Sequence, residues 1–301
     1  MHSGKTILTS HSPRRAGLLL IASAALTGPF TAAADGPYVS LSASGTWQDN
    51  VTNAPSGDGT RSAFDAESGV TVSWLRSLDF STILSAGVAS DVDISATYRG
   101  LDSLGVVPSL ELRHKAGIGP LATVLHAGLE GQLVGFTDPE RSNMGAAILL
   151  GLSQRLDEAL QFAVDGRLGS YDARDIVFTG SYASLRAALN WDVDSIWRIK
   201  LLGGWRNGDS VSDYAAVRTA TGWGPVDKGA YNLPGAWHYV RTFNDPFVAY
   251  RVSAVTWSDG ISVSPAIGPN SAVTLQFMRY DTRGRDRYVN NAVTASVSHR
   301  F

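Results

Sequence analysis

The stretch "NNAVTASVSHRF", residues 290–301, decides the fold. Its apolar residues Val293, Ala295 and Val297 alternate with polar ones, and the aromatic Phe301 is the last residue of the sequence. Alternation with a period of two places apolar and polar side chains on opposite faces of a β-strand. We therefore expect a strand that runs to the end of the sequence and is paired within a sheet.

The N-terminal region has the pattern of a secretory signal peptide. Arg14 and Arg15 precede the apolar run "AGLLLIASAAL", and small residues follow as far as Ala34. The apolar run is too short for a transmembrane helix, which needs about 20 residues. A basic region, a short apolar core and a small-residue site predict cleavage after residue 34 and a mature chain of residues 35–301.

Charge and cysteine content exclude several classes of function. Removing residues 1–34 takes away Lys5, Arg14, Arg15 and no acidic residue, which leaves 22 basic and 27 acidic residues, a net charge of −5. This mildly acidic chain has no clustered basic stripe, so we expect no nucleic-acid partner. The sequence has no cysteine, which excludes disulfide bonds and thiolate metal sites.

Period-two alternation recurs along the mature chain. In "SLELRHKA" (109–116), Leu110 and Leu112 alternate with Glu111, Arg113 and Lys115. The same pattern occurs in segments 38–48, 80–93, 160–169, 184–191 and 197–206. After residue 34 no apolar run approaches the length of a membrane-spanning helix. The sequence therefore predicts an all-β protein whose strands have one apolar and one polar face.

The connections between these segments alternate in length. Short links at 76–79, 117–120, 156–158, 192–195 and 268–271 alternate with longer ones at 49–61, 137–143 and about 207–245. Short turns at one end and longer loops at the other are typical of transmembrane β-barrels. Aromatic residues near the expected strand ends fit the aromatic girdles of such barrels; they are Trp47, Trp74, Phe80, Trp191, Trp197, Trp205, Trp257 and Phe301.

The number of strands depends on the segment from 207 to 271. The dipeptide Asp259-Gly260 is a hairpin signal and favours 14 strands. The segment "ISVSPAIG" is short and contains Pro265, which favours about 12 strands and one long extracellular loop near 207–245. Both numbers are even, as is expected of single-chain bacterial barrels. We expect 12 strands, with 14 as the alternative, because long loops are normal in such barrels.

The C-terminal stretch resembles the signal that the barrel-assembly machinery recognises in Gram-negative outer-membrane proteins. Phe301 and the alternating Val293, Ala295 and Val297 fit that signal, whereas His299 departs from it. The resemblance implies a porin-like transmembrane antiparallel up-and-down β-barrel in the outer membrane. It also implies the barrel-assembly machinery, outer-membrane lipid and lipopolysaccharide as partners.

Catalytic patterns are largely absent from the mature sequence. None of the four histidines, His114, His126, His238 and His299, precedes a serine by two positions, and no G-x-S-x-G sequence occurs. His126 is expected to face the barrel interior near Glu130 and to pair with it. Spaced histidine pairs for zinc are also absent. We expect no enzymatic activity, no cofactor and no metal.

Acidic residues occur in pairs near expected strand ends. Asp65 and Glu67 lie two positions apart, as do Asp91 and Asp93, so each pair shares a strand face. Asp281 lies near Asp286. We interpret these pairs as solvated charges at the rim; the alternative is that they bind divalent cations.

The polar strand faces are expected to line the interior, because a charge on the lipid face costs about 2–4 kcal/mol at the membrane midplane. The predicted pore-lining residues are Glu67, Glu111, Arg113, Lys115, Glu130, Arg155, Asp165, Arg167, Arg186, Arg198, Lys200 and Arg206. A barrel of about 12–14 strands is wide enough for a water-filled interior. We expect a passive diffusion channel for small polar or anionic solutes. The alternatives are a non-conducting structural, adhesion or partner-binding barrel plugged by loop 207–245, and an outer-membrane lipid-modifying enzyme that uses His126.

Overall fold

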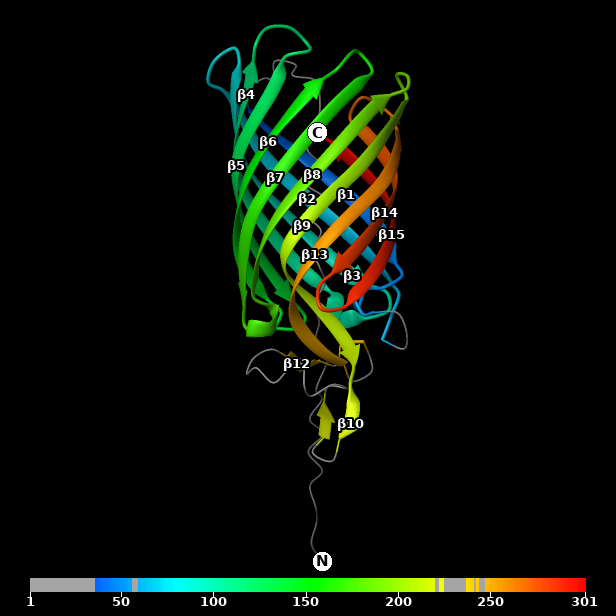
Figure 1. The fold of residues 1–301 in the computed structure, drawn as a ribbon. Coiled ribbons are helices and arrows are strands. Elements are labelled where there is room, and N and C mark those ends of the chain that lie inside the picture. The colour runs from blue at the N-terminus through cyan, green and yellow to red at the C-terminus, as the bar shows by residue number, and fades with distance from the viewer. Residues whose placement is uncertain (1–35, 56–58, 220–221, 225–236, 241, 244–246) are drawn as a thin grey trace, which may run out of the picture.

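Twelve antiparallel strands form a closed ring (Figure 1). The computed structural model describes residues 36–55, 59–219, 222–224, 237–240, 242–243 and 247–301. The strands of the ring are β1 (Gly36–Gln48), β2 (Ala63–Ser77), β3 (Thr82–Ser95), β4 (Ser103–Ala116), β5 (Thr123–Phe136), β6 (Asn143–Arg155), β7 (Leu160–Ala173), β8 (Gly180–Asp192), β9 (Trp197–Ala215), β13 (Phe247–Pro265), β14 (Ser271–Arg283) and β15 (Arg287–Arg300). The predicted fold class is confirmed.

The ring closes between its first and last strands. β1 pairs with β15 in a register that runs from Ser40 opposite Arg300 to Gln48 opposite Ala292. The backbone N–H of Phe301 donates a 2.9 Å hydrogen bond to the carbonyl oxygen of Val39. The C-terminal stretch is therefore paired, as its alternation predicts, and closure leaves neither β1 nor β15 with a free edge.

Short turns join the strands at the end of the barrel where β1 begins and β15 ends, which we call the terminal end. In three of these turns an aspartate accepts hydrogen bonds from backbone N–H groups two or three residues ahead; they are Asp79, Asp157 and Asp194. Such side-chain bonds replace a backbone turn, which is why aspartate favours tight connections. The bonds from Ser81 lower the pKa of Asp79 to about 2.

The alternative of 14 strands is wrong, because Asp259 and Gly260 lie inside β13. This strand pairs with β9 without a break from Phe247 to Pro265. Gly260 serves a close approach instead of a turn, since a Cβ atom there would lie 2.3 Å from Sδ of Met278 on β14. Cross-strand pairing over the whole length of β13 overrides the local hairpin signal.

At the opposite end, which we call the loop end, the strand β9 continues beyond the predicted boundary. It runs to Ala215, so residues 207–215 of the predicted long loop belong to a strand. Three short strands follow, β10 (Val217–Thr219), β11 (Gly222–Gly224) and β12 (Trp237–Val240), and β12 pairs with the start of β13. The remainder of that loop lies largely outside the described residues, as does the predicted signal peptide.

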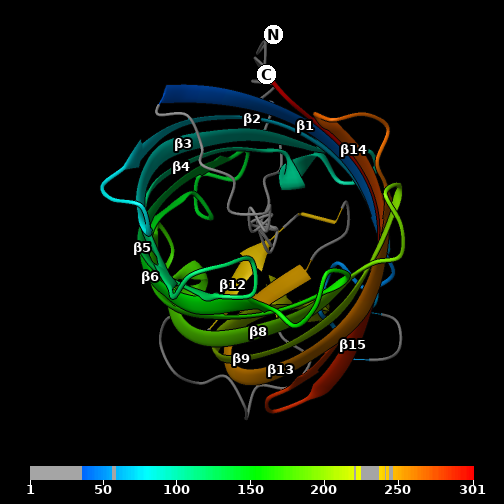
Figure 2. The same cartoon turned by 90° about the horizontal axis from the view of Figure 1, so that it is seen from above.

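Two 3₁₀ turns belong to connections at the loop end, η1 (Arg99–Leu101) between β3 and β4 and η2 (Ile176–Phe178) between β7 and β8. Seen along the barrel axis, β12 lies within the outline of the ring, and the side view places it beyond the ends of most strands (Figures 1 and 2). The two views together place β12 across the opening at the loop end. The loop end is therefore partly covered.

Apolar side chains cover the outer surface of the ring. The exposed aromatic residues include Trp47, Trp74, Phe80, Trp191, Trp197, Trp257 and Phe301, all of them predicted girdle residues. Phe80 in the turn after β2 is 91% exposed. Within the described residues, no helix has the length and apolar character needed to cross a membrane.

Candidate functional site

Most charged side chains of the strands β2 to β9 face the inside of the ring. On β4, β5 and β7 the exposed residues Leu110, Leu129 and Leu168 mark the outer face, and the alternate positions point inward. By this alternation all twelve predicted lining residues take inner positions: Glu67, Glu111, Arg113, Lys115, Glu130, Arg155, Asp165, Arg167, Arg186, Arg198, Lys200 and Arg206. Their part in conduction stays a prediction.

Ion pairs tie the inner faces of β4, β5 and β7 together. Glu130 on β5 accepts from Nη2 of Arg167 on β7 at 2.6 Å, across the intervening β6. On β4, Glu111 pairs with Arg113 two positions along the same strand. These residues form a network on the barrel wall in which acidic and basic side chains neutralise one another.

His126 joins this network with a different partner from the one predicted. Its Nε2 lies 2.8 Å from Oδ1 of Asp165, and its Nδ1 lies 3.8 Å from Oε1 of Glu111. The expected pairing with Glu130 is wrong, because Glu130 is occupied by Arg167. Residues four positions apart on one strand are farther from each other than residues that share a row across neighbouring strands.

Gly151 makes the contact between His126 and Asp165 possible. It lies between them in register, opposite His126 on one side and Asp165 on the other. A Cβ atom at this position would lie 2.0 Å from Nε2 of His126 and 2.7 Å from Oδ1 of Asp165. The absence of a side chain on β6 therefore lets β5 and β7 bond directly.

A second ionic group lies at the terminal end of the interior. Asp192 on β8 contacts Nε of Arg198 on β9 at 2.5 Å and Nη2 of Arg155 on β6 at 3.7 Å. It thus links three strands in the same manner as the network above. Both arginines are predicted lining residues that are engaged by a carboxylate.

Three further basic residues of the interior lie on the neighbouring strands β8 and β9. No ion pair joins Arg186, Lys200 or Arg206 to a carboxylate in the described part of the chain. The guanidinium of Arg206 stacks over the ring of Tyr182 at 4.9 Å and donates to the carbonyl oxygen of Asp209. We call Arg186, Lys200 and Arg206 the basic wall.

An acidic wall lies opposite. Glu67 on β2 is directly across from Asp93 on β3, and Asp91 faces inward one inner position away. We call Glu67, Asp91 and Asp93 the acidic wall; Asp65 adjoins it. β2–β3 and β8–β9 are six strands apart in a ring of twelve, so the two walls lie on opposite sides of the interior. The sequence-based interpretation placed the pairs Asp65/Glu67 and Asp91/Asp93 at the rim as solvated charges, whereas Asp65 and Asp91 are buried.

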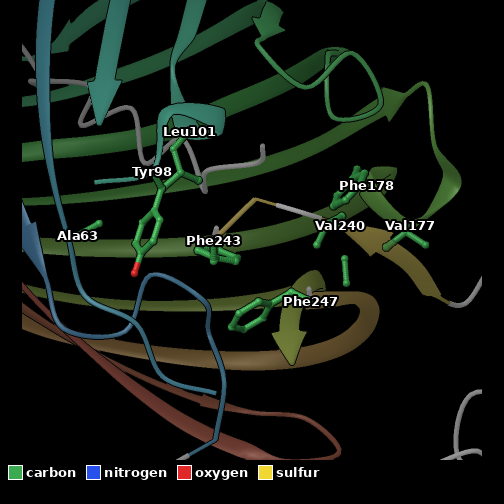
Figure 3. Packing of buried hydrophobic residues seen from close by; sticks show 9 residues of the cluster. Ala63, Tyr98, Leu101, Val177, Phe178, Val240, Phe243 and Phe247 are labelled. Atoms are coloured by element: carbon green, nitrogen blue, oxygen red, sulfur yellow. The ribbon is translucent and has the colours of Figure 1, made fainter. Parts of the chain in front are cut away.

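Apolar residues from several connections meet at the loop end (Figure 3). The members of this cluster are Ala63, Tyr98, Leu101, Val177, Phe178, Val240, Phe243, Phe247 and Ala249. They come from the start of β2, from η1, from η2, and from β12 and β13, so the strands that supply them are spread over more than half of the ring. A single buried cluster with these sources lies across the opening, and we call it the cap.

Aromatic contacts hold the cap together. The rings of Tyr98 and Phe243 meet edge to face with centroids 5.2 Å apart, and Phe243 packs on Phe247 at 4.9 Å. Tyr98 precedes η1, whereas Phe243 lies between β12 and β13 and Phe247 is the first residue of β13. The contact therefore bridges opposite parts of the rim (Figure 3).

A buried arginine lies beside the cap. Arg141, in the β5–β6 connection, is 1% exposed. Its Nη2 lies 3.2 Å from Oδ1 of Asp213 on β9, its Nε lies 3.7 Å from Oδ2 of Asp138, and its guanidinium stacks 4.3 Å from the ring centre of Phe178. Burial raises the pKa of Asp138, and the charge of Arg141 acts against that rise. Burial also lowers the pKa of Arg141, against the opposing effect of Asp213.

A histidine fixes β12 to the neighbouring connections. Nε2 of His238 lies 2.6 Å from Oε2 of Glu140, and its Nδ1 lies 2.8 Å from Oδ2 of Asp175. The backbone N–H of Asp175 also donates to the carbonyl oxygen of Glu140 at 3.0 Å. Both ring nitrogens thus face carboxylate oxygens, and His238 links β12 to the β5–β6 and β7–β8 connections. Sequence reasoning missed Arg141 and gave His238 no role.

Neither a nucleophile arrangement nor a metal site emerges from these contacts. His126 contacts carboxylates, and His299 contacts the hydroxyl of Ser271 at 2.8 Å at the terminal end. Among the described residues, no group of three or more histidine or acidic side chains is arranged to hold a metal ion. The predicted acidic pair of Asp281 and Asp286 does not act together. Asp281 contacts Arg283 and Arg287, whereas Asp286 accepts a hydrogen bond from Tyr214.

Three solved structures are similar to this chain, and one of them, with a TM-score above 0.5, shows the same type of fold. An outer membrane channel from Pseudomonas putida F1 superimposes with a TM-score of 0.56 at 10% identity, over 91% of this chain and 98% of that one. The NanC porin gives a TM-score of 0.47 at 8% identity, over 86% and 98% of the two chains. The KdgM porin in complex with disordered oligogalacturonate gives 0.42 at 10% identity, over 87% and 99%. No family model and no curated protein matches the sequence.

The similarity to the Pseudomonas putida structure concerns the fold alone, because the sequences share 10% identity. The chain is a closed 12-stranded antiparallel β-barrel, the fold that it shares with this outer membrane channel.

Proposed function

We propose that this protein is an integral outer-membrane barrel of a Gram-negative bacterium and a passive diffusion channel for small polar solutes. In this proposal the basic wall attracts the anionic groups of the solute. The observation that carries it is the separation of charge in the interior, with an acidic wall on β2–β3 and a basic wall on β8–β9. The apolar outer surface with aromatic residues near both ends supports the membrane location.

The width of the ring supports a water-filled interior. A barrel of about eight strands is just filled by its own side chains, and the diameter grows with strand number. Glu67 and Arg186 take inner positions and are nonetheless exposed. Solvent therefore reaches both walls, which is a condition for contact with a passing solute.

The cap favours a second candidate function, a non-conducting barrel that binds a partner at its loop end. A buried apolar cluster lies across the opening and is fixed by Arg141 and His238. In the channel proposal this cap narrows the entrance; in the second candidate it seals it. Both include the outer-membrane location.

Single-channel recording in planar bilayers separates the two candidates. The channel proposal predicts discrete conductance steps from the purified wild-type protein. Bilayers that stay closed at high protein loading, with wild type and with a cap-loosened Arg141→Met variant alike, would refute it. Steps from the variant alone would show that the cap seals the wild-type barrel.

Charge reversal tests the basic wall. Arg186→Glu combined with Lys200→Glu is expected to shift the reversal potential in a salt gradient toward cation selectivity, because both side chains face the interior. Arg76→Glu is the matched control, since Arg76 lies on the outer face of β2 near the terminal end. Equal ion selectivity in wild type and the double variant would show that Arg186 and Lys200 do not determine it.

A further inference from the structure

Charged side chains are concentrated on one part of the outer surface. The outer positions of β3, β4, β5 and β6 carry no aspartate, glutamate, lysine or arginine. On β14 and β15, in contrast, the outer positions toward the loop end hold Arg279, Asp281, Arg283 and Arg287. A surface that faces lipid excludes charge unless the charge lies near the interface or has a partner.

One carboxylate organises two of these arginines. Asp281 accepts hydrogen bonds from Nε and Nη2 of Arg287 at 2.9 and 2.8 Å and from Nη2 of Arg283 at 3.1 Å. The two arginine side chains remain 62% and 60% exposed. One carboxylate between two guanidinium groups leaves a net positive charge, with the remaining N–H donors directed to the surroundings.

The position along the barrel places this arginine pair at the level of a membrane interface, a step that rests on the proposed outer-membrane location. Arg283 and Arg287 flank the β14–β15 hairpin at the loop end, opposite each other in register. Asp281 is opposite Trp257, which is opposite Trp205 on β9. Tryptophans concentrate at membrane interfaces, where the lipid headgroups lie.

The next row toward the membrane is neutral. Arg279 lies directly opposite Asp259 on β13, so the two charges compensate each other across neighbouring strands. Two residues farther along these strands, Phe277 lies opposite Ile261, and from there on the outer surface is again apolar. The uncompensated positive charge is therefore confined to the arginine pair at the edge of this apolar surface.

We propose that Arg283 and Arg287, positioned by Asp281, bind the phosphate group of an anionic lipid in the outer leaflet. A phosphate oxygen pair matches the planar, bidentate donor geometry of a guanidinium group, and two guanidinium groups held side by side present several donors to one phosphate. The site faces outward beside an apolar surface that can accommodate the acyl chains of the same lipid.

Native mass spectrometry of the full-length mature barrel with phosphatidic acid, a lipid with a phosphate monoester headgroup, tests the proposal. Wild type is expected to retain bound phosphatidic acid in preference to phosphatidylcholine. Arg283→Gln combined with Arg287→Gln is expected to weaken retention about tenfold, because charge-assisted hydrogen bonds to the phosphate are lost. Arg76→Gln is the matched control, since it removes an outward-facing arginine at the other end of the barrel.

Three outcomes would overturn the proposal. Equal retention of phosphatidic acid in the double variant and wild type would show that the arginine pair does not hold it. Complete displacement by inorganic phosphate would show a site for soluble phosphate instead of a lipid. A change from oligomer to monomer in the double variant, without loss of lipid, would assign the surface to contact with a second copy.

The Asp281→Asn variant examines the positioning carboxylate. It keeps both arginine charges and removes the acceptor that aligns them, so we expect weaker retention of phosphatidic acid; unchanged or stronger retention would refute the role of Asp281. Circular dichroism confirms that each variant has folded. Lipid retention is measured independently of conductance, so a failure of this proposal and a failure of the channel proposal are distinguishable.

Discussion

Replacing Arg141 with methionine removes the buried cation beside the cap and keeps a long side chain that can pack on Phe178. In the native structure, Arg141 is 1% exposed, and its carboxylate partners Asp213 and Asp138 have side chains that are 5% and 7% exposed. Removing one partner of a buried ion pair costs about 3–5 kcal/mol, because the opposite charge stays buried without compensation. At 1.4 kcal/mol per power of ten, the closed cap becomes more than about a hundredfold less favoured.

Hydrogen exchange followed by mass spectrometry measures this effect directly. The Arg141→Met variant is expected to exchange faster in residues 137–142 and at the start of β13, whereas β4–β8 keep wild-type protection. Combining it with Asp213→Asn should restore part of the protection, because a buried charge is removed. Arg155→Met is the matched control. Arg155 lies 3.7 Å from the carboxylate of Asp192 and its side chain is 24% exposed, so we expect its replacement to cost about 1 kcal/mol of stability or less. Wild-type exchange in the Arg141→Met cap would refute the argument.

Two further predictions concern the interior and the pH dependence of the cap. Gly151→Ala places a Cβ atom 2.0 Å from Nε2 of His126, so it should break the contact between His126 and Asp165 and lower the free energy of unfolding in urea by about 1–3 kcal/mol. Gly203→Ala is the control, because no atom lies within 4 Å of its Cβ, and it should leave the free energy of unfolding almost unchanged. Equal effects of the two substitutions would contradict the reasoning. Because burial raises the pKa of Asp138 above its ordinary value of 3.8, the folded cap binds this proton more readily than the unfolded one. The stability of the cap should therefore fall as pH rises from the ordinary pKa of 3.8 through the raised pKa of Asp138 in the folded cap. Protease resistance of the cap measures this pH dependence, and Asp138→Asn should abolish the part that Asp138 contributes. The same pH profile in wild type and Asp138→Asn would contradict this prediction.

The barrel and its inner face were predictable because both follow from a period of two. Once apolar residues such as Leu110 and Leu112 face outward, Glu111 and Arg113 between them must face inward, whatever the neighbouring strands are. The closing pair of strands was predictable for a related reason. A final strand like 290–301 needs a partner on both edges, and in a ring the remaining partner is the first strand.

Contacts that depend on the arrangement of strands around the ring were not predictable from one sequence. The predicted partner of His126 was Glu130 on the same strand, whereas its partner is Asp165, reached across β6 because Gly151 has no side chain. Arg141 lies in the polar stretch "TDPERSN", which reads as an ordinary exposed loop. Its partner Asp213 is distant in sequence, and the two meet only because β9 extends beyond the ring and other connections fold over it.

In the proposed channel, the ion pairs of the interior reduce the number of lining residues whose charge is available to a solute. Glu130 and Arg167 satisfy each other, and Asp192 engages Arg198, so these charges cancel locally and serve mainly to tie strands together. The basic wall of Arg186, Lys200 and Arg206 and the acidic wall of Glu67, Asp91 and Asp93 lack such ion pairs in the described residues. Only charges without a nearby counterion set up a field across the interior, because a close pair is neutral at the distance of a solute. In the proposed channel, solute selectivity therefore depends on these two walls, and the paired residues contribute chiefly to the stability of the barrel.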